Sequence, residues 1–209
     1  ECMLSSPPAK TRDVMTVYNK AAVEVCSGQQ MDMDFEKNNF VSHTDYLRMI
    51  ELKTAVLLAA SLRIGAIIGN AEPEEAEKLY SFGINLGLAF QIQDDLLDTY
   101  GDPVIFGKKI GQDIVSNKKT ILLIKALELA SGEQLQTLNR QLQLKDFDRE
   151  DKISRVKTVY DELGIRAAVE EMASQYTGLA YASLREVKTG DNRKEELIKL
   201  ADYLLRRRN

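Results

Sequence analysis

One short segment of the chain carries three aspartates at a spacing suited to binding a divalent cation. Residues 90–98 read Phe-Gln-Ile-Gln-Asp-Asp-Leu-Leu-Asp. On an α-helix, four of these side chains fall on one face within about 100° of arc: Gln91, Asp94, Asp95 and Asp98. Carboxylates at this spacing repel one another, and near a helix C-terminus the helix dipole disfavours each by roughly 0.3–1 kcal/mol. Mg²⁺ shared between carboxylates and a substrate phosphate removes the conflict, so the segment predicts a magnesium–phosphate site.

A glycine- and lysine-rich segment follows soon after the aspartates. It spans Gly107–Thr120 and reads Gly-Lys-Lys-Ile-Gly-Gln-Asp-Ile-Val-Ser-Asn-Lys-Lys-Thr. Lysine ammonium groups are compact charges that neutralise phosphate oxygens, and glycines let a loop close over a ligand. A solvated acidic face is the plain alternative for the aspartates taken alone. The basic loop beside them favours a diphosphate site.

The rest of the sequence predicts helices that position these two segments. With only four prolines and no long alternation of apolar and polar residues, we expect helix nearly throughout. Helices are expected over about 12–30, from a cap at Thr44 to about 69, over 73–98, and in three or four further pieces after a loop at 101–118. No repeat or linker divides the sequence. Residues 1–209 are therefore predicted to belong to one all-α domain.

Composition excludes several other classes of protein. The chain is 44% apolar and 29% charged, which is typical of a globular protein rather than a disordered one. A net charge of −4 gives no support to nucleic-acid binding. The longest apolar region, Ala55–Ile68, is interrupted by polar residues and is too short for a transmembrane segment. Cys2 and Cys26 lack metal-ligand spacing, and we expect a reducing, cytoplasmic environment.

The motifs, taken in order, resemble a known family. The pattern F-Q-x-x-D-D-x-x-D, followed by G-K-x-x-G-x-D-[IL] and N-K-x-T, is similar to the second aspartate-rich motif and downstream lysines of the trans-isoprenyl diphosphate synthases. Upstream, Lys53-Thr54 resembles the family's K-T motif and Gly28–Asp32 resembles its G-Q-x-x-D segment. The resemblance covers nearly the whole chain, although beyond Thr120 it is only a matter of helical pattern.

The resemblance implies a fold and a set of site residues. The fold would be an isoprenoid synthase-type helical bundle, incomplete at its amino terminus, and the cofactor would be Mg²⁺. The implied roles are metal binding by Asp94, Asp95 and Asp98, diphosphate binding by Lys53, Lys109 and Lys118, and pocket lining by Gln29, Thr54 and Gln91, with Asp94 and the three lysines acting in catalysis. Because Lys108 stands next to Lys109, the choice between these two lysines of the loop stays open.

The implied reaction joins an allylic diphosphate to isopentenyl diphosphate and gives a longer trans-polyprenyl diphosphate, of geranyl, farnesyl, geranylgeranyl or greater length. Mg²⁺ and lysines would stabilise the departing pyrophosphate and leave an allylic cation. The double bond of isopentenyl diphosphate would attack that cation, and a proton would then be lost. The family also implies a homodimer.

Two family features are missing from the sequence: a first aspartate-rich motif with paired arginines, and a basic segment that holds isopentenyl diphosphate. We therefore expect the chain to be the carboxy-terminal portion of a longer synthase and to have no prenyltransferase activity alone. A class I terpene cyclase is one alternative, but its second metal motif, N-D-x-x-S-x-x-x-E, is absent. A non-catalytic regulatory subunit is another, although such subunits usually have degraded aspartate motifs, and the motif here is intact.

Overall fold

All regular structure in the described part of the chain is helical, which confirms the predicted all-α class. The computed structural model describes residues 7–38, 40–102 and 109–205. Its helices are η1 (Pro8–Lys10), α1 (Thr11–Lys37), α2 (His43–Ile50), the π-helical turn η2 (Glu51–Ala55), α3 (Val56–Ile68), α4 (Pro73–Tyr100), α6 (Gln112–Val115), α7 (Ile121–Leu129), α8 (Gly132–Gln143), α9 (Arg149–Glu162), α10 (Ile165–Glu186) and α11 (Asp191–Leu205).

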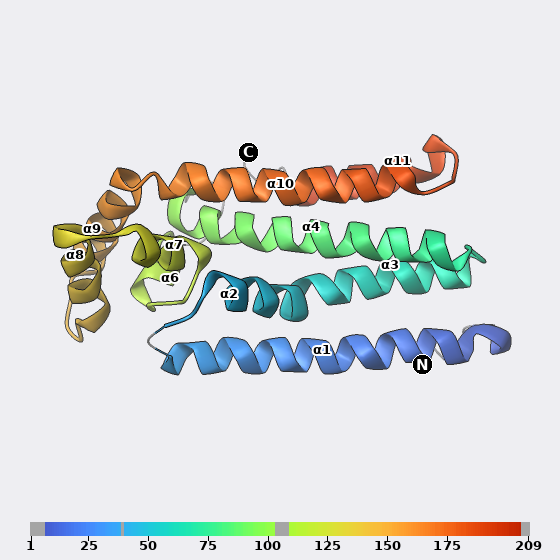
Figure 1. Ribbon diagram of the computed structural model, residues 1–209, viewed down its shortest axis with the longest axis horizontal. Helices are drawn as coiled ribbons and strands as arrows, with labels where there is room; N and C mark the ends of the chain where they lie inside the picture. The colour runs from blue at the N-terminus through green and yellow to red at the C-terminus, as the bar shows by residue number, and fades with distance from the viewer. Residues whose placement is uncertain (1–6, 39, 103–108, 206–209) are drawn as a thin grey trace.

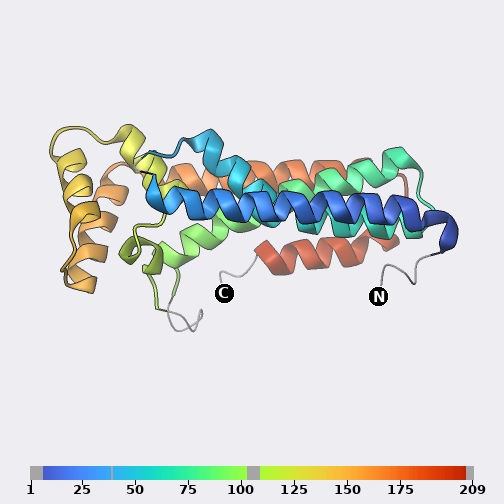
Figure 2. The ribbon, with the colours of Figure 1, turned by 90° about the horizontal axis from the view of Figure 1, so that it is seen from below.

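Four long helical columns lie side by side in the order α1, α2–η2–α3, α4 and α10 (Figure 1). Helix α11 runs back after α10, contacts α4 and shares a core cluster with α10. The short helices α6 to α9 gather at one end of the columns, where α4 finishes (Figures 1 and 2). The acidic end of α4 and the basic segment after it therefore lie at the same end of the molecule. In the described residues, no helix is long and apolar enough to cross a bilayer.

Glycines let the first three columns approach closely. A Cβ on Gly87 of α4 would lie 2.5 Å from Cα of Ala55, and one on Gly28 of α1 would lie 2.8 Å from the carbonyl carbon of Leu52. Real Cβ atoms essentially never come this close, so any side chain at either position would push the helices apart. The π-helical turn is thus held between glycines of two neighbouring helices.

The π-helical turn is one point on which the expected helices were wrong. We expected an uninterrupted helix over about 44–69, but Glu51–Ala55 has π-helical hydrogen bonding. The cap is also two residues earlier than expected: Ser42, not Thr44, accepts a hydrogen bond from the amide of Asp45 at 3.1 Å. Single π turns are rare, and those that do occur are often found at functional sites. This one carries Lys53 and Thr54.

Other parts of the helix prediction also differ from the structure: in the described residues five helices, α7 to α11, follow residue 118, where three or four were expected. Helix α1 continues to Lys37 rather than ending near Gln30, because Phe35 in its last turns is buried in the main core. The predicted loop over 101–118 contains the short helix α6. The long helix that begins at Pro73 carries all three aspartates, as predicted.

A large core cluster anchors the acidic end of α4 from behind. Ile92 and Leu96 of α4 belong to it, together with Ile121 and Leu122 of α7. These four side chains are all 5% exposed or less. Burial on this scale is worth about 1.5–3 kcal/mol for each large aliphatic side chain, so the register of the aspartates is fixed by the core and not by the aspartates themselves.

Candidate active site

The three aspartates of α4 do not share one environment. Asp94 is exposed, Asp98 is half-buried, and Asp95 is only 1% exposed. The sequence predicted metal binding by all three and a catalytic role for Asp94 alone among them. Their surroundings divide them into a solvent-facing carboxylate, one at the edge of the protein and one in its interior.

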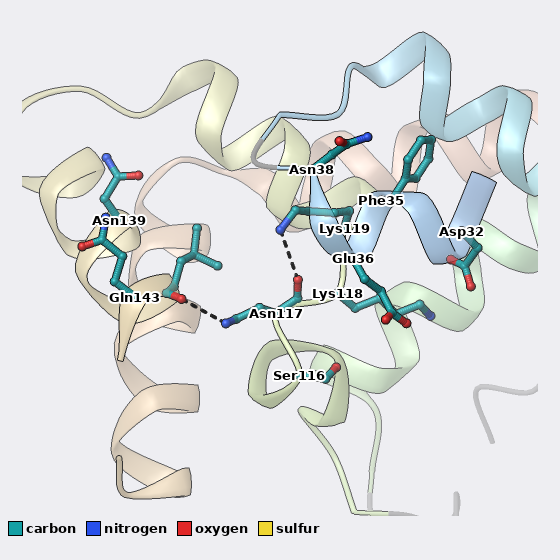
Figure 3. A pocket seen from close by; sticks show the side chains of 11 residues that line it. Asp32, Phe35, Glu36, Asn38, Ser116, Asn117, Lys118, Lys119, Asn139 and Gln143 are labelled. Atoms are coloured by element: carbon teal, nitrogen blue, oxygen red, sulfur yellow. Dashed lines mark hydrogen bonds between the residues drawn. The ribbon is translucent and has the colours of Figure 1, made fainter. Parts of the chain in front are cut away.

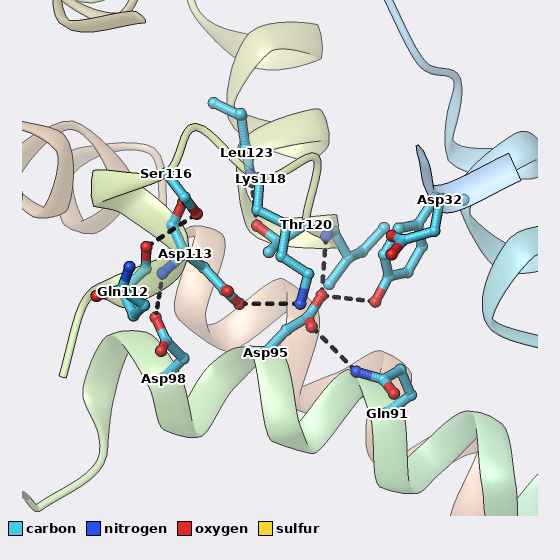
Figure 4. A network of polar contacts seen from close by, with 12 residues as sticks. Asp32, Gln91, Asp95, Asp98, Gln112, Asp113, Ser116, Lys118, Thr120 and Leu123 are labelled. Atoms are coloured by element: carbon cyan, nitrogen blue, oxygen red, sulfur yellow. Dashed lines mark hydrogen bonds and ion pairs between the residues drawn. The ribbon is translucent and has the colours of Figure 1, made fainter. Parts of the chain in front are cut away.

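The carboxylate of Asp95 joins three helices (Figure 4). Its Oδ2 accepts hydrogen bonds from the hydroxyl of Tyr46 on α2 at 2.6 Å and from the backbone amide of Ile121 at the start of α7 at 3.3 Å. Its Oδ1 accepts from Nε2 of Gln91 at 3.4 Å. Burial raises its pKa, while the charge of Lys118 and these hydrogen bonds oppose the rise. Any metal role for Asp95 therefore stays a prediction, while its contacts position the site.

The segment after α4 folds back onto Asp98. The backbone amide of Asp113 donates to Asp98 Oδ2 at 2.9 Å, and the amide of Gly111 donates to the carbonyl of Asp98 at 2.6 Å. Gly111 has φ +76°, a conformation that glycine adopts without steric cost. These two bonds bring the carboxylate of Asp113 beside that of Asp98.

Lys118 completes this charged group. Its Nζ lies 3.4 Å from Asp113 Oδ2. Burial lowers the pKa of Lys118, but Asp95 and Asp113 outweigh it, and the pKa stands above its ordinary value. Burial raises the pKa of Asp113 to about 7; Lys118 opposes the rise and the charges of Asp98 and Asp95 add to it. The three carboxylates of Asp95, Asp98 and Asp113 thus carry more negative charge than the one ammonium of Lys118 neutralises.

Lys53 and Thr54 project from the π-helical turn toward neighbouring helices. Lys53 Nζ donates to Asp32 Oδ2 of α1 at 2.7 Å. The hydroxyl of Thr54 donates to Gln91 Oε1 of α4 at 3.2 Å. Gln91 therefore accepts from Thr54 with one end of its amide and donates to Asp95 with the other, which fixes its orientation.

A cleft of about 760 Å³ lies between the end of α1, the turn before α7, and α8 (Figure 3). Asp32 lines one side, and Lys118 and Lys119 line the other. Lys53 is joined to this cleft through its ion pair with Asp32. The structure thus brings Lys53 and Lys118, 65 positions apart in the sequence, to one region through Asp32.

Two predicted site residues are less closely engaged. Gln29 is exposed on α1, three residues before Asp32. Lys109 is exposed at the start of the described part of the basic segment, and Lys108 lies outside the described residues. Their roles in substrate binding stay predictions.

The residues fit a divalent cation by their chemistry. The acidic end of α4 offers hard carboxylate oxygens, and the raised pKa of Asp113 reflects burial and the nearby charges of Asp95 and Asp98, a combination that a cation would relieve. Within the described ranges, no group of three or more His, Cys, Asp or Glu side chains is arranged to hold a metal by itself. The predicted coordination uses one or two carboxylates and substrate phosphate oxygens, which is the kind that Mg²⁺ prefers.

Three residues near the site were not among the predicted site residues. Asp113 stands in the quoted G-K-x-x-G-x-D pattern, so the signal for it was present. Asp32 closes the quoted G-Q-x-x-D segment, so a signal for it was present too, and the structure shows that it contacts Lys53. Tyr46 carries no sequence signal, since its partner Asp95 lies 49 positions away.

Comparison with known proteins agrees with these motifs. Residues 2–163 match the family model described as polyprenyl synthetase. The chain is 34% identical over 196 residues to a short chain isoprenyl diphosphate synthase of Methanothermobacter thermautotrophicus, covering 94% of this chain and 59% of that protein. It is 37% identical to the geranylgeranyl diphosphate synthase of Saccharolobus solfataricus, covering 90% of this chain and 56% of that protein.

Solved structures show the same fold. A crystal structure of a geranylgeranyl pyrophosphate synthase superimposes with a TM-score of 0.91 at 36% identity, covering 99% of this chain and 64% of that one. Geranylgeranyl pyrophosphate synthetase from Pyrococcus horikoshii gives a TM-score of 0.87 at 32% identity, covering 96% of this chain and 60% of that one. The chain thus spans less than two thirds of the length of these relatives. On its motifs, its fold and these matches, the chain belongs to the polyprenyl synthetase family.

Proposed function

We propose that this chain is part of an isoprenyl diphosphate synthase, a prenyltransferase that joins an allylic diphosphate to isopentenyl diphosphate. The observation that carries the proposal is the meeting of Lys118, Asp113 and Asp98 at the acidic end of α4, where opposite charges face one another beside an open cleft. The relatives that carry synthase names support this reaction class.

The allylic diphosphate would bind at the acidic end of α4 through magnesium and lysines. Asp94 and Asp98 would hold Mg²⁺, since the first is exposed and the second lies at the protein's edge. Lys53, Lys109 and Lys118 would neutralise the remaining phosphate charge. Bound Mg²⁺ would supply positive charge that stabilises the departing pyrophosphate.

The chain's own residues would prepare the site for that departure. Lys118 is already held among carboxylates, so its ammonium is in place before substrate arrives and little reorganisation is needed. Lys53 is held by Asp32 and would share its charge with the diphosphate. The oriented amide of Gln91, with Thr54 beside it, would line the path of the prenyl chain.

Residues 1–209 would supply only part of a single helical domain. The sequence contains no counterpart of the family's first aspartate-rich motif, so half of the metal site would come from elsewhere in the whole protein. We therefore propose that the 209 residues bind magnesium and diphosphate but do not turn over substrate. Assembly as a homodimer and a cytoplasmic location also stay predictions.

Calorimetric titration with a bisphosphonate tests the proposal. We expect saturable binding in the presence of Mg²⁺ and none in EDTA, together with no product from geranyl diphosphate and isopentenyl diphosphate. Failure of the chain to bind the bisphosphonate at millimolar concentration with Mg²⁺ would favour a vestigial site, as in a regulatory subunit. Product formation by this chain would instead overturn the proposed division of the site.

A further inference from the structure

Lys152 of α9 is a buried lysine whose charge needs an explanation. It is 1% exposed, and burial lowers its pKa. Among the described residues, no carboxylate lies within ion-pairing distance of its Nζ. Burying an ammonium group without a counter-charge costs desolvation free energy, and a methionine of similar volume would fill the same space without that cost. Stability alone does not account for a lysine here.

The contacts of Lys152 point to the turn that carries Lys118. Its Nζ donates to Oδ1 of Asn117 at 2.7 Å and to the carbonyl of Val115 at 3.4 Å. The ring of Phe147 covers the ammonium, with its centroid 4.2 Å away, and supplies a weak cation–π attraction. Both hydrogen bonds of the amine are therefore made to the turn just before Lys118, at Val115 and Asn117.

Asn117 is the residue that this lysine fixes. It has φ +56°, in the left-handed region, which asparagine adopts more readily than most residues with a side chain but less readily than glycine. Its Nδ2 donates to the carbonyl of Leu142 on α8 at 3.0 Å (Figure 3). Its Oδ1 accepts from Lys152, so α8 holds one end of the amide and α9 holds the other. This turn sets the direction in which the next residue, Lys118, leaves the backbone.

A second cation of α9 holds the other end of the same segment. Arg149 donates to the carbonyl of Ile110 at 2.8 Å and to Oε1 of Gln112 at 3.1 Å. Asp113 lies between these contacts and those of Lys152. The first turn of α9 thus makes hydrogen bonds to residues 110–117 on both sides of Asp113, which lies beside Asp98 at the acidic end of α4.

We propose that Lys152 is a positioning residue, which fixes the turn at Asn117 so that the Lys118 ammonium faces the diphosphate. Lys152 does not line the cleft of Figure 3, but it lines a second, small cavity together with Asp113 and Lys118. Its effect on a ligand must therefore pass through the turn. The proposal rests on the proposed function, because it assumes that Lys118 binds diphosphate.

A double-mutant cycle with inorganic pyrophosphate and Mg²⁺ tests the proposal. We expect Lys152→Met to weaken binding about tenfold, the size expected when one charge-assisted hydrogen bond is lost, and Lys118→Ala to weaken it at least as much. In the Lys118→Ala background, Lys152→Met should have little further effect. An equal loss in both backgrounds, or unchanged affinity in folded Lys152→Met, would overturn the proposal.

Two further variants keep the test sharp if Lys152→Met folds poorly. Asn117→Gly tolerates the positive φ and removes the nearer of the two acceptors of Lys152, so it should weaken pyrophosphate binding in the same way. Lys78→Met is a control away from the site. Lys78 donates to the backbone carbonyl of Glu186 at 3.0 Å, where the start of α4 meets the end of α10, and pairs with Glu75 at 2.8 Å. This variant should leave pyrophosphate affinity unchanged.

Acetic anhydride labelling of Lys118, followed by mass spectrometry, separates failure of this proposal from failure of the proposed function. In the parent chain the ammonium is held by Asp113 and should react slowly. In Lys152→Met and Asn117→Gly its labelling rate should rise several-fold. If the parent binds no pyrophosphate, the proposed function fails, and the labelling still decides the positioning. Unchanged labelling would overturn the positioning.

Discussion

Tyr46 of α2 donates its hydroxyl to the buried carboxylate of Asp95 on α4 at 2.6 Å, across 49 positions of sequence. Both side chains are 1% exposed. The pKa of Tyr46 stands well above its ordinary value, because of burial and then the charge of Asp95. The tyrosine therefore stays protonated and acts as a permanent donor to the carboxylate.

Tyr46→Phe should lower the free energy of unfolding by about 1–3 kcal/mol, since a buried carboxylate loses a charge-assisted hydrogen bond. Urea denaturation followed by circular dichroism measures this. Tyr18→Phe, at an exposed position of α1, is the control and should change stability by no more than about 0.5 kcal/mol. Equal stabilities of the two variants would contradict the role assigned to Tyr46.

Asp94 and Asp95 are neighbours for which we predict opposite behaviour. Asp94→Asn should leave the free energy of unfolding nearly unchanged, because Asp94 is exposed, yet weaken Mg²⁺-dependent pyrophosphate binding at least tenfold. Asp95→Asn should lower stability by about 1–3 kcal/mol, because an amide group cannot accept all three hydrogen bonds. Denaturation and calorimetry of both variants check this. A stability loss confined to Asp94→Asn would refute the division of roles.

Sequence reasoning found the acidic segment and Lys118 because both depend on local spacing. It missed the π-helical turn, which is held between Gly28 of α1 and Gly87 of α4, neither of them a local neighbour of Lys53. Nor could it show that Asp95 is buried while Asp94 is exposed, because that difference depends on packing against distant residues such as Tyr46.

The same limit applied to Lys152. Lysine is almost never fully buried, so periodicity gave no reason to place it inside. The helix class and the long acidic helix were predictable from composition and pattern. The contacts that orient the site come from helices far apart in the sequence.

Gly28→Ala tests the close approach of α1 to the π-helical turn. An added Cβ would meet Leu52 and the backbone of Lys53, so we expect a loss of about 1–3 kcal/mol in the free energy of unfolding. Gly178→Ala is the matched control in α10, where nothing lies within 4 Å of the added Cβ. There alanine should stabilise the helix by about 0.5–1 kcal/mol. Thermal denaturation of both variants checks the pair, and destabilisation by both would contradict the packing described.

His43 is the only histidine in the sequence and gives a clean pH prediction. Burial and then the charge of Lys125 lower its pKa below the ordinary value of 6.5. The folded state therefore prefers the neutral ring, and the stability that His43 contributes is present above pH 6.5 and is lost as the pH falls through its lower folded pKa.

Its ring proton resonance should titrate below 6.5 in the folded protein, as measured by NMR. His43→Gln should remove that part of the stability loss on the acid side, which appears in the difference between the two stability curves. A folded pKa above 6.5 would reverse the sign of the effect and refute the prediction.

The proposed function requires that the acidic end of α4 share a divalent ion with a diphosphate. A crystal structure with Mn²⁺ and pyrophosphate, recorded at the manganese absorption edge, tests it most directly. We predict an anomalous peak at bonding distance from a carboxylate oxygen of Asp94 or Asp98, with pyrophosphate oxygens on its other side and Lys118 within hydrogen-bonding reach. Pyrophosphate and manganese bound elsewhere, with these carboxylates bare, would contradict the account.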